Sequence, residues 1–267
     1  MPRARVSSAE WCAHFEGSAS LPDEVPWESA VRLTEAERRA VAASIQEFQL
    51  GESSEGRHLH AAARAHAAST GDHAYARAIA AFIREEQRHA RGFGRFLAGE
   101  GIPLRRHSWP DAVFRQLRRG VGLETTVCVL LTAELIAQVY YAALRDATQS
   151  PTLRALCGRI LRDEAAHVRF QAERIAMLRA GHAPSRVWLA QAGQRALFAG
   201  AVLVVWWGHR SALTRGGFPF RRYWRQCWER FASAAATMVP APTATAAPEP
   251  ASLGASAGLR REAASAP

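Results

Sequence analysis

Two short motifs in this chain pair a carboxylate with an imidazole at the same spacing: Glu86-Gln-Arg-His89 and Glu164-Ala-Ala-His167. Residues three positions apart lie on one face of an α-helix, about one turn from each other. Carboxylate oxygens and imidazole nitrogens are ligands that iron and manganese accept in proteins. Each motif therefore offers half of a metal site, provided that the segment around it is helical.

Each motif is preceded by a further glutamate at nearly the same distance. Glu134 lies 30 residues before Glu164, and Glu55 lies 31 residues before Glu86. A lone Glu-x-x-His is common by chance, whereas two copies with matched upstream glutamates are not. Four carboxylates and two imidazoles can hold a pair of metal ions at the centre of a helical bundle. The predicted ligands are Glu55, Glu86, His89, Glu134, Glu164 and His167.

The positions of the predicted turns support this pairing. In a hairpin of two antiparallel helices, residues equidistant from the turn lie at the same height. The midpoint between Glu134 and Glu164 falls within 148–151, and the midpoint between Glu55 and Glu86 falls within 69–72. Both segments contain the proline, glycine and small polar residues that mark a turn. Each hairpin is thus expected to bring its glutamate level with its Glu-x-x-His motif.

The identity of the first ligand stays open at this point. Glu52 lies one turn before Glu55 and on the same face of the predicted helix. The turn midpoint favours Glu55, and Glu52 is the alternative.

The residues directly before the two motif glutamates, Glu85 and Asp163, are also acidic. A metal-bound histidine usually donates its second ring N–H to a carboxylate, which fixes the tautomer and the orientation of the ring. We therefore predict that Asp163 supports His89 and that Glu85 supports His167, each contact crossing between the two hairpins. The alternative is that both acidic residues are solvated charges on the helix surface.

The rest of the sequence predicts an all-α fold, because apolar residues recur at helical rather than alternating spacing. A capping box at 34–37 begins a first helix that runs to about residue 68, with an interruption near Gly51 and Gly56. A connection of about twenty residues separates the two hairpins, which is long enough to run back along a bundle. The later helices are expected at about 72–98, 110–119 (short), 122–147, 151–180, 185–208 and 223–231.

We expect one domain with two extensions. Residues 1–33 are predicted to be an irregular lead-in, 34–237 the helical domain, and 238–267 a disordered tail rich in proline and alanine. Within the domain, 34–180 form the core bundle and 185–236 add further helices. The apolar run Ala196–Gly208 is shorter than the twenty or so residues that span a bilayer, so core packing is favoured over docking on a membrane surface.

Charge and cysteine content narrow the partners and the compartment. The formal net charge is +10, yet all the basic side chains are arginines and they are dispersed, which favours a compositional bias over a nucleic-acid-binding surface. The four cysteines show no Cys-x-x-Cys spacing and fit buried thiols in a reducing compartment. The N-terminal residues contain no apolar signal segment. We therefore expect a cytoplasmic protein.

The six ligands and the two preceding acidic residues resemble the ferritin-like di-iron carboxylate superfamily, which includes ferritins, rubrerythrins and oxygenases. The resemblance covers about residues 34–180 and implies a ferritin-like four-helix bundle with additional C-terminal helices. It implies two iron ions, with manganese or a mixed pair as alternatives. The spacing of Glu52 from Glu86, 34 residues, is also one that the family uses.

The resemblance implies an oxidoreductase that activates O2 to hydroxylate, desaturate or N-oxygenate a small organic substrate. No catalytic residue beyond the metal ligands is assigned, and a separate electron donor is required. A substrate pocket is expected near Phe82, Val127, Leu131 and Tyr141. The alternatives are a ferroxidase, peroxide-scavenging or iron-storage protein, and a metal-stabilised binding protein without catalysis. A homodimer is compatible with all three.

Overall fold

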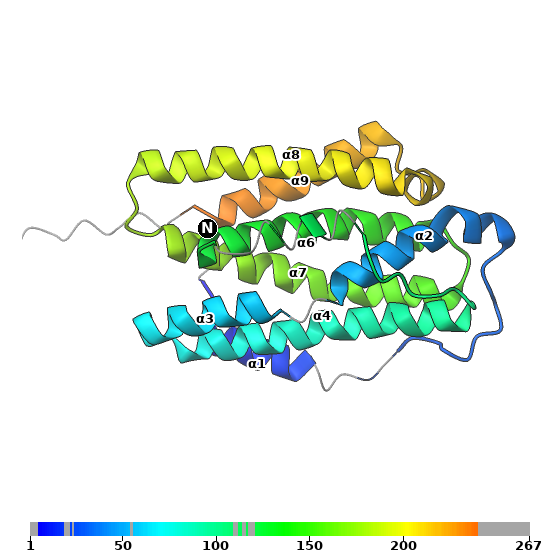
Figure 1. The fold of residues 1–267 in the computed structure, drawn as a ribbon, viewed down its shortest axis with the longest axis horizontal. Helices are drawn as coiled ribbons and strands as arrows, with labels where there is room; N and C mark the ends of the chain where they lie inside the picture. Colours follow the sequence, from blue (N-terminus) through cyan, green and yellow to red (C-terminus); the bar gives the residue numbers. More distant parts are fainter. Residues whose placement is uncertain are drawn as a thin grey trace, which may run out of the picture.

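The computed structural model describes residues 5–18, 22, 24–53, 56–108, 112–113, 116 and 121–239. Helices are the regular structure of these residues, and no strand occurs among them, so the all-α prediction is confirmed. The helices, labelled as in Figure 1, are α1 (Ser8–Ser18), α2 (Glu35–Glu52), α3 (Arg57–Thr70), α4 (His73–Gly99), α6 (Leu123–Asp146), α7 (Pro151–Arg179), α8 (Pro184–Arg215) and α9 (Phe220–Thr237).

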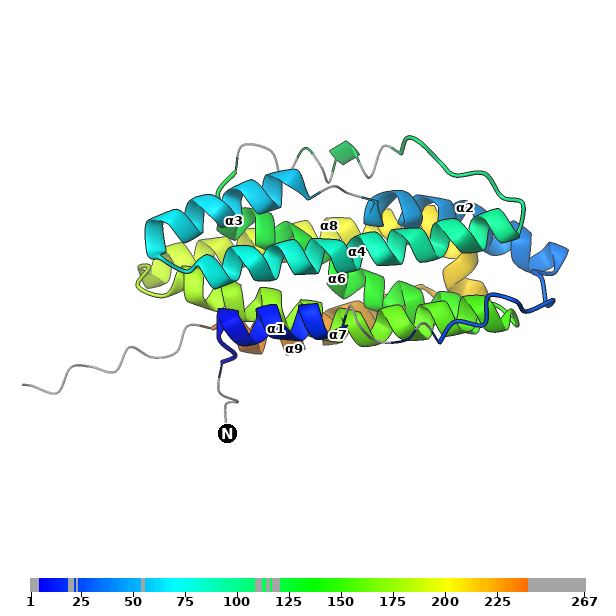
Figure 2. The ribbon, with the colours of Figure 1, turned by 90° about the horizontal axis from the view of Figure 1, so that it is seen from below.

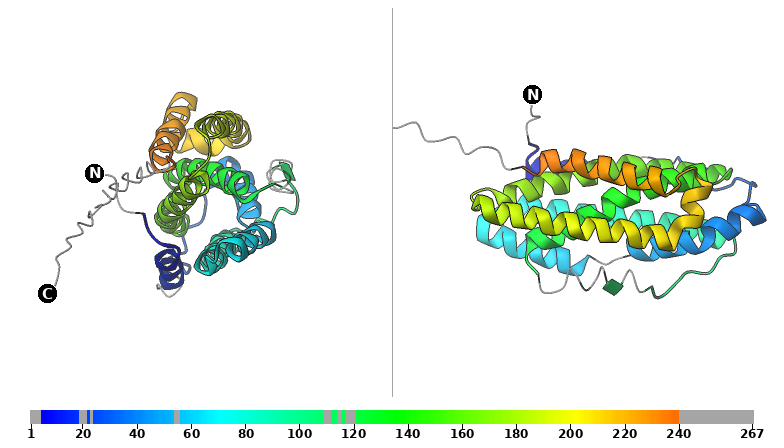
Figure 3. Two further views of the ribbon diagram at one scale, coloured as in Figure 1. Left: turned by 90° about the vertical axis from the view of Figure 1, so that its left-hand side faces the viewer. Right: turned by 90° about the horizontal axis from the view of Figure 1, so that it is seen from above.

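The long helices run along the same axis of an elongated molecule (Figure 1, Figure 2). Helix α6 packs against α7 and also against α8 and α9, which cover one side of this pair. Helix α4 lies on the other side, where α1 and α3 pack against it (Figure 1). Seen from the end, α6 lies close to the middle of the group (Figure 3).

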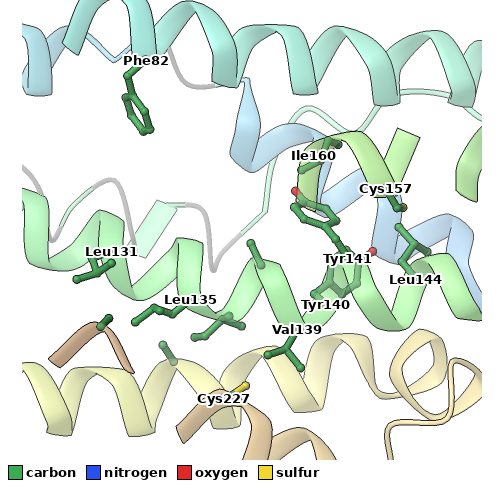
Figure 4. Packing of buried hydrophobic residues seen from close by; sticks show 14 of the residues in the cluster. Phe82, Leu131, Leu135, Val139, Tyr140, Tyr141, Leu144, Cys157, Ile160 and Cys227 are labelled. Atoms are coloured by element: carbon green, nitrogen blue, oxygen red, sulfur yellow. The ribbon is translucent and has the colours of Figure 1, made fainter. Parts of the chain in front are cut away.

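The sequence of α6 explains its central position. The apolar side chains of α6 itself point to nearly all sides of the helix, and a helix of that kind is stable only inside a protein or a membrane. Leu135 and Val139 point toward α8 and α9, where Cys227 lies (Figure 4). Tyr140 and Tyr141 lie near Ile160 of α7 in the same view, and all of these side chains are buried.

The first predicted helix is two helices. Helix α2 ends at Glu52 and α3 begins at Arg57, with Gly56 between them in the left-handed region at φ 63°. A Cβ atom at Gly56 would lie 2.6 Å from Ile83 Cδ1, so glycine is required both for the backbone conformation and for the close approach to α4. The interruption was expected at this place, but it ends the helix rather than distorting it.

The prediction of an irregular lead-in over 1–33 is wrong for part of that segment. Residues Ser8–Ser18 form α1, whose Trp11, Cys12 and Phe15 are buried. These positions share one helix face and pack toward α4 and α7, with Phe15 and Phe170 in edge contact. The helix is short and carries few apolar residues, so its stability comes from this tertiary contact rather than from a strong local pattern.

The two C-terminal helices are longer than predicted. Helix α8 extends to Arg215 rather than 208, and α9 spans Phe220–Thr237 rather than 223–231. The helices α6 and α7 match their predicted ranges within a residue. The short helix expected at 110–119 and the tail from 240 onward fall mostly or wholly outside the described residues.

Helices α6 and α8 are each long and apolar enough, by length and composition, to cross a membrane. In α6, 83% of the most apolar 18-residue segment is buried inside the protein, as expected for a core helix. In α8, 33% of the corresponding segment is buried. Because this apolar segment of α8 has 18 residues, it extends beyond the shorter run Ala196–Gly208 considered from sequence. The cytoplasmic location stays a prediction.

The Gly56 turn gives a testable prediction. Gly56→Ala should lower the free energy of unfolding by about 1–3 kcal/mol, because it adds left-handed strain and crowds Ile83. Gly51→Ala is the matched control, since a Cβ there meets nothing within 4 Å and α2 is already helical at that point. It should leave stability unchanged or raise it by up to about 1 kcal/mol. Urea denaturation of both variants followed by circular dichroism measures this, and equal effects would contradict the prediction.

Candidate metal centre

The two Glu-x-x-His motifs face each other across the protein interior. Helix α4 supplies Glu86 and His89, and α7 supplies Glu164 and His167. Their potential ligand atoms form two groups in which all atoms lie within 4.8 Å of one another. The first group is Glu86, Glu134, Glu164 and His167, and the second is Glu52, His89 and Glu164.

The remaining predicted ligands come from α6 and α2. Glu134 is buried near the middle of α6 and belongs to the first group. Glu55 lies outside the described residues, so its position as the favoured first ligand stays a prediction. Glu52, the alternative, is the last residue of α2 and belongs to the second group. Of the described carboxylates in α2, Glu52 is the one that belongs to the cluster.

Both motif glutamates lie between the two imidazoles. Glu86 Oε1 is 3.0 Å from His167 Nδ1 and 3.7 Å from His89 Nδ1. Glu164 Oε2 is 3.7 Å from His167 Nδ1, and Glu164 Oε1 is 3.9 Å from His89 Nδ1. Ligand atoms about 2.1 Å from one ion in an octahedral site are about 3.0 Å apart. The shortest of these separations equals that distance and the other three are longer, and Glu86 and Glu164 each lie within 4 Å of both imidazole nitrogens.

The predicted contacts across the hairpins are present. His89 Nε2 lies 3.0 Å from Asp163 Oδ2, and His167 Nε2 lies 3.1 Å from Glu85 Oε2. When each Nε2–H donates to its carboxylate, the lone pair of a neutral imidazole resides on Nδ1. Nδ1 is the nitrogen that points into the cluster in both rings.

Several buried atoms of the cluster have no hydrogen-bond partner in the part of the chain that the structure describes. They are Glu86 Oε1, His89 Nδ1, His167 Nδ1 and both carboxylate oxygens of Glu164. Buried polar atoms normally have a partner, and leaving them without one costs about 1–3 kcal/mol each. All five belong to residues of the two groups of potential ligands, so one cation in each group would satisfy them. The residues present fit a metal pair.

Burial makes this cluster unfavourable as a set of bare charges. It raises the pKa of Glu134 well above the usual value, and the nearby charge of Glu164 adds to the effect. Burial and the charge of Glu86 do the same to the pKa of Glu52, and burial raises the pKa of Glu164 to about 7. Without a cation, some of these carboxyl groups therefore retain protons near neutral pH.

The cluster also raises the pKa of His167, which in an imidazole favours the charged form. Burial alone would lower the pKa of His167, but the charge of Glu86 and the carboxylates around the ring, among them the hydrogen-bonded Glu85, raise it well above the usual value. The same imidazole holds the pKa of Glu85 at about 2, against the opposing effect of burial. Protons and metal ions thus compete for the same atoms.

Sequence reasoning missed three side chains that hold the ligands in place. Gln171 Nε2 donates to Glu134 Oε1 at 3.0 Å, and the Tyr141 hydroxyl donates to Glu52 Oε1. Gln138 Nε2 donates to the backbone carbonyl of Glu164 at 3.0 Å. A signal existed, because Gln171 is one turn after His167, and Tyr141 is two turns after Glu134 on the same face of its helix.

Helix α1 also contributes to the site. The Ser18 hydroxyl donates to Glu85 Oε1 at 2.6 Å, and Arg88 also pairs with this oxygen. The Phe15 ring lies 5.8 Å from the His167 ring. These contacts fix Glu85 and shield His167, and they were missed because the lead-in was expected to be irregular.

An apolar cavity of about 190 Å³ reaches the cluster from the side of α2, α3, α6 and α8. Glu52, Glu86 and Glu134 of the cluster are among the residues that line it. Of the four residues predicted for the pocket, Phe82 lines this cavity, whereas Val127, Leu131 and Tyr141 do not. Leu130 lines it instead of Leu131, because successive helical residues point about 100° apart.

No protein-family model matches this sequence, and no curated protein is significantly similar to it.

The carboxylates that orient the imidazoles give a second prediction. Asp163→Asn and Glu85→Gln should each weaken Mn²⁺ binding by about 10–100-fold, because the amides hold the ring tautomers less firmly. Asp146→Asn is the matched control, since Asp146 pairs with Arg145 at the end of α6. Isothermal titration calorimetry measures the affinities. Equal affinities in all three variants would show that these carboxylates do not act on the histidines.

Proton competition gives a third prediction. Because the pKa of Glu164 is raised to about 7, this carboxyl group is protonated below that pH and must lose its proton when a metal binds. The affinity for Mn²⁺ should therefore rise with pH, by about tenfold per unit for each proton displaced. Titrations at pH 5.5, 6.5 and 7.5, in buffers of different ionisation enthalpy, measure the affinity and count the protons released. An affinity independent of pH would contradict the buried cluster as the binding site.

Proposed function

We propose that this chain is a ferritin-like di-iron oxidoreductase that uses O2 to oxidise a small organic substrate. The observation that carries the proposal is the cluster of lone-pair donors without hydrogen-bond partners, described above, beside an apolar cavity. Metal binding alone would require the cluster but not the cavity. A cavity that ends on metal ligands favours chemistry on an organic molecule.

The two groups of ligand atoms suggest how the ions are held. Glu86, Glu134, Glu164 and His167 would hold one ion, and Glu52, His89 and Glu164 would hold the other. Carboxylates mixed with imidazoles favour iron or manganese over copper, and the absence of thiolate ligands in the cluster disfavours a structural zinc site. Helices α2 and α3 together with α4, α6 and α7 would form the ferritin-like four-helix bundle.

Bound ferrous ions would supply the electrons that reduce O2, which no side chain of the cluster can do. In a hydroxylation, one C–H bond becomes C–OH and the second oxygen atom leaves as water. The balance requires two electrons and two protons from a separate reductant, which this proposal includes as a partner. The chain itself holds the ligands, and the apolar cavity walls exclude water from the reacting C–H group.

Residues around the ligands fix their protons. Asp163 and Glu85 accept the Nε2 protons of the two histidines, so that both Nδ1 atoms are available to metal. Gln171 donates to Glu134 and Tyr141 donates to Glu52, which leaves the second oxygen of each carboxylate free to bind. These contacts keep the ligand geometry in place when metal is absent.

Anaerobic loading with Fe²⁺ tests the function. The protein should bind about two ions per chain and then consume O2 when it is admitted, as followed with an oxygen electrode. Glu86→Ala and Glu164→Ala should abolish both properties, because each removes a carboxylate ligand of the cluster. Glu229→Ala, a change at an exposed position of α9, is the matched control and should behave as the wild type.

The other outcomes separate the alternatives. Fewer than two metal ions per chain would contradict the di-iron proposal. Two ions without consumption of O2 would favour a metal-stabilised binding protein or a manganese site. Oxygen consumption that stores ferric iron in a large symmetric assembly, seen by size-exclusion chromatography, would favour an iron-storage protein.

A further inference from the structure

The cavity beside the cluster has two chemically different ends. Ligand carboxylates, including Glu52 and Glu86, line one part of it, which we call the inner end. Glu47 of α2 and His209 of α8 line the part that we call the outer end, because His209 bonds Ser44, which lies eight residues before Glu52 in α2, or about 12 Å along the helix. Apolar side chains line the space between them, among them Phe48, Leu59, Ile83, Leu130 and Val205. A molecule in the cavity would therefore meet apolar walls and one polar region away from the cluster.

His209 is held in a fixed orientation at this outer end. Its Nδ1 lies 2.7 Å from the Ser44 hydroxyl, which lies 2.8 Å from the Tyr140 hydroxyl. The ring also packs edge-on against Phe48, with centroids 4.9 Å apart. His209 is 5% exposed, and burial lowers its pKa to about 4, so the imidazole is neutral near pH 7.

The hydrogen-bond chain determines which ring nitrogen carries the proton. Tyr140 is buried, and Ser44 is the hydrogen-bond partner of its hydroxyl among the described residues. If Ser44 donated to Tyr140, the buried Tyr140 proton would have no acceptor. If Tyr140 and His209 Nδ1 both donated to Ser44, the serine proton would have no acceptor among the described residues. The satisfied arrangement has Tyr140 donating to Ser44 and Ser44 donating to His209 Nδ1. The proton of the neutral ring is then on Nε2.

Nε2 is available to a ligand. His209 lines the cavity, its Nδ1 is turned to Ser44, and Nε2 has no hydrogen-bond partner in the part of the chain that is described. Glu47, the other polar residue at this end, is already engaged. It accepts from the Ser108 hydroxyl at 2.6 Å and from Arg105 at 3.3 Å. This end therefore offers an N–H donor rather than a free negative charge.

The size of the cavity limits the ligand. A protein cavity of about 150 Å³ lined by apolar side chains binds benzene. The present cavity of about 190 Å³ is slightly larger. One six-membered ring with a small substituent would therefore fill it.

Resting on the proposed function, we propose that the substrate is a neutral one-ring compound with one oxygen acceptor, such as a carbonyl group. The oxygen accepts a hydrogen bond from His209 Nε2, and the opposite end of the ring lies toward Glu52 and Glu86, where it is oxidised. His209 is thus a positioning residue that decides which carbon atom reaches the cluster.

A pair of nearly isosteric probes tests this assignment. Acetophenone carries a carbonyl oxygen where α-methylstyrene carries a methylene group, so the two differ chiefly in the ability to accept a hydrogen bond. Wild-type protein, both metal-free and loaded with Mn²⁺, should bind acetophenone about fivefold more tightly, as expected for one hydrogen bond of about 1 kcal/mol. Calorimetric titration measures both dissociation constants.

Three variants identify the residues responsible. His209→Phe should remove the preference for acetophenone while leaving the affinity for α-methylstyrene within about twofold, because an aromatic ring still fills the position. Ser44→Ala should reduce the preference, because it frees the tautomer of His209. Val205→Phe narrows the cavity from α8 and should weaken the binding of both probes, with the helical circular dichroism unchanged.

The contrary results are equally specific. Equal affinity for the two probes in the wild type, no binding of either probe, or an unchanged preference in His209→Phe would each overturn the assignment. Because binding is measured without iron or O2, it does not depend on the redox proposal. If the protein prefers acetophenone but consumes no O2, the proposed function alone is overturned. If it consumes O2 but shows no preference for acetophenone, the ligand assignment alone is overturned.

Discussion

The requirement that buried carboxylates be neutralised dominates the centre of this protein. Four helices bring Glu52, Glu86, Glu134 and Glu164 into an interior where bare negative charges are very costly. Protons, the charge on His167 or metal ions can compensate them, and a pair of metal ions would also occupy the lone pairs that have no partner. The helices therefore enclose a cluster whose charge must be balanced by protons or by bound cations, and the surrounding core must be stable enough to hold it together.

That stability comes from the helices outside the cluster. Helix α6 is apolar on nearly every side, and α7, α8 and α9 bury it, so the position of Glu134 is fixed by packing well beyond the site. Helix α1 covers the opposite side and fixes Glu85 through Ser18. The break between α2 and α3 ends a helix at Glu52 and, together with α8, leaves the space that forms the cavity. The cluster and the cavity beside it thus depend on the short helix α1 and on the break between α2 and α3 as much as on the long helices.

Much of the fold and most of the site could be predicted from sequence, because the relevant signals are local. Helical spacing placed Glu86 with His89 and Glu164 with His167, and the turns at 69–72 and 148–151 set the two hairpins in register. The acidic residues at 85 and 163 followed from the known need of a ligating histidine for a carboxylate. The helical nature of Ser8–Ser18 escaped prediction, because a short segment with three buried side chains carries too weak a periodic signal.

The sequence by itself determined the helical class, the two facing motifs and the residue types available to a metal, since these depend on spacing along single helices. Tertiary structure decided the rest. It placed Glu52 in the cluster. It also decided that Leu130 rather than Leu131 lines the cavity, and that His209 of α8 contacts Ser44 of α2. Contacts of this kind join residues that are distant in sequence, and a helical pattern specifies which face a residue occupies but not which other helix that face will meet.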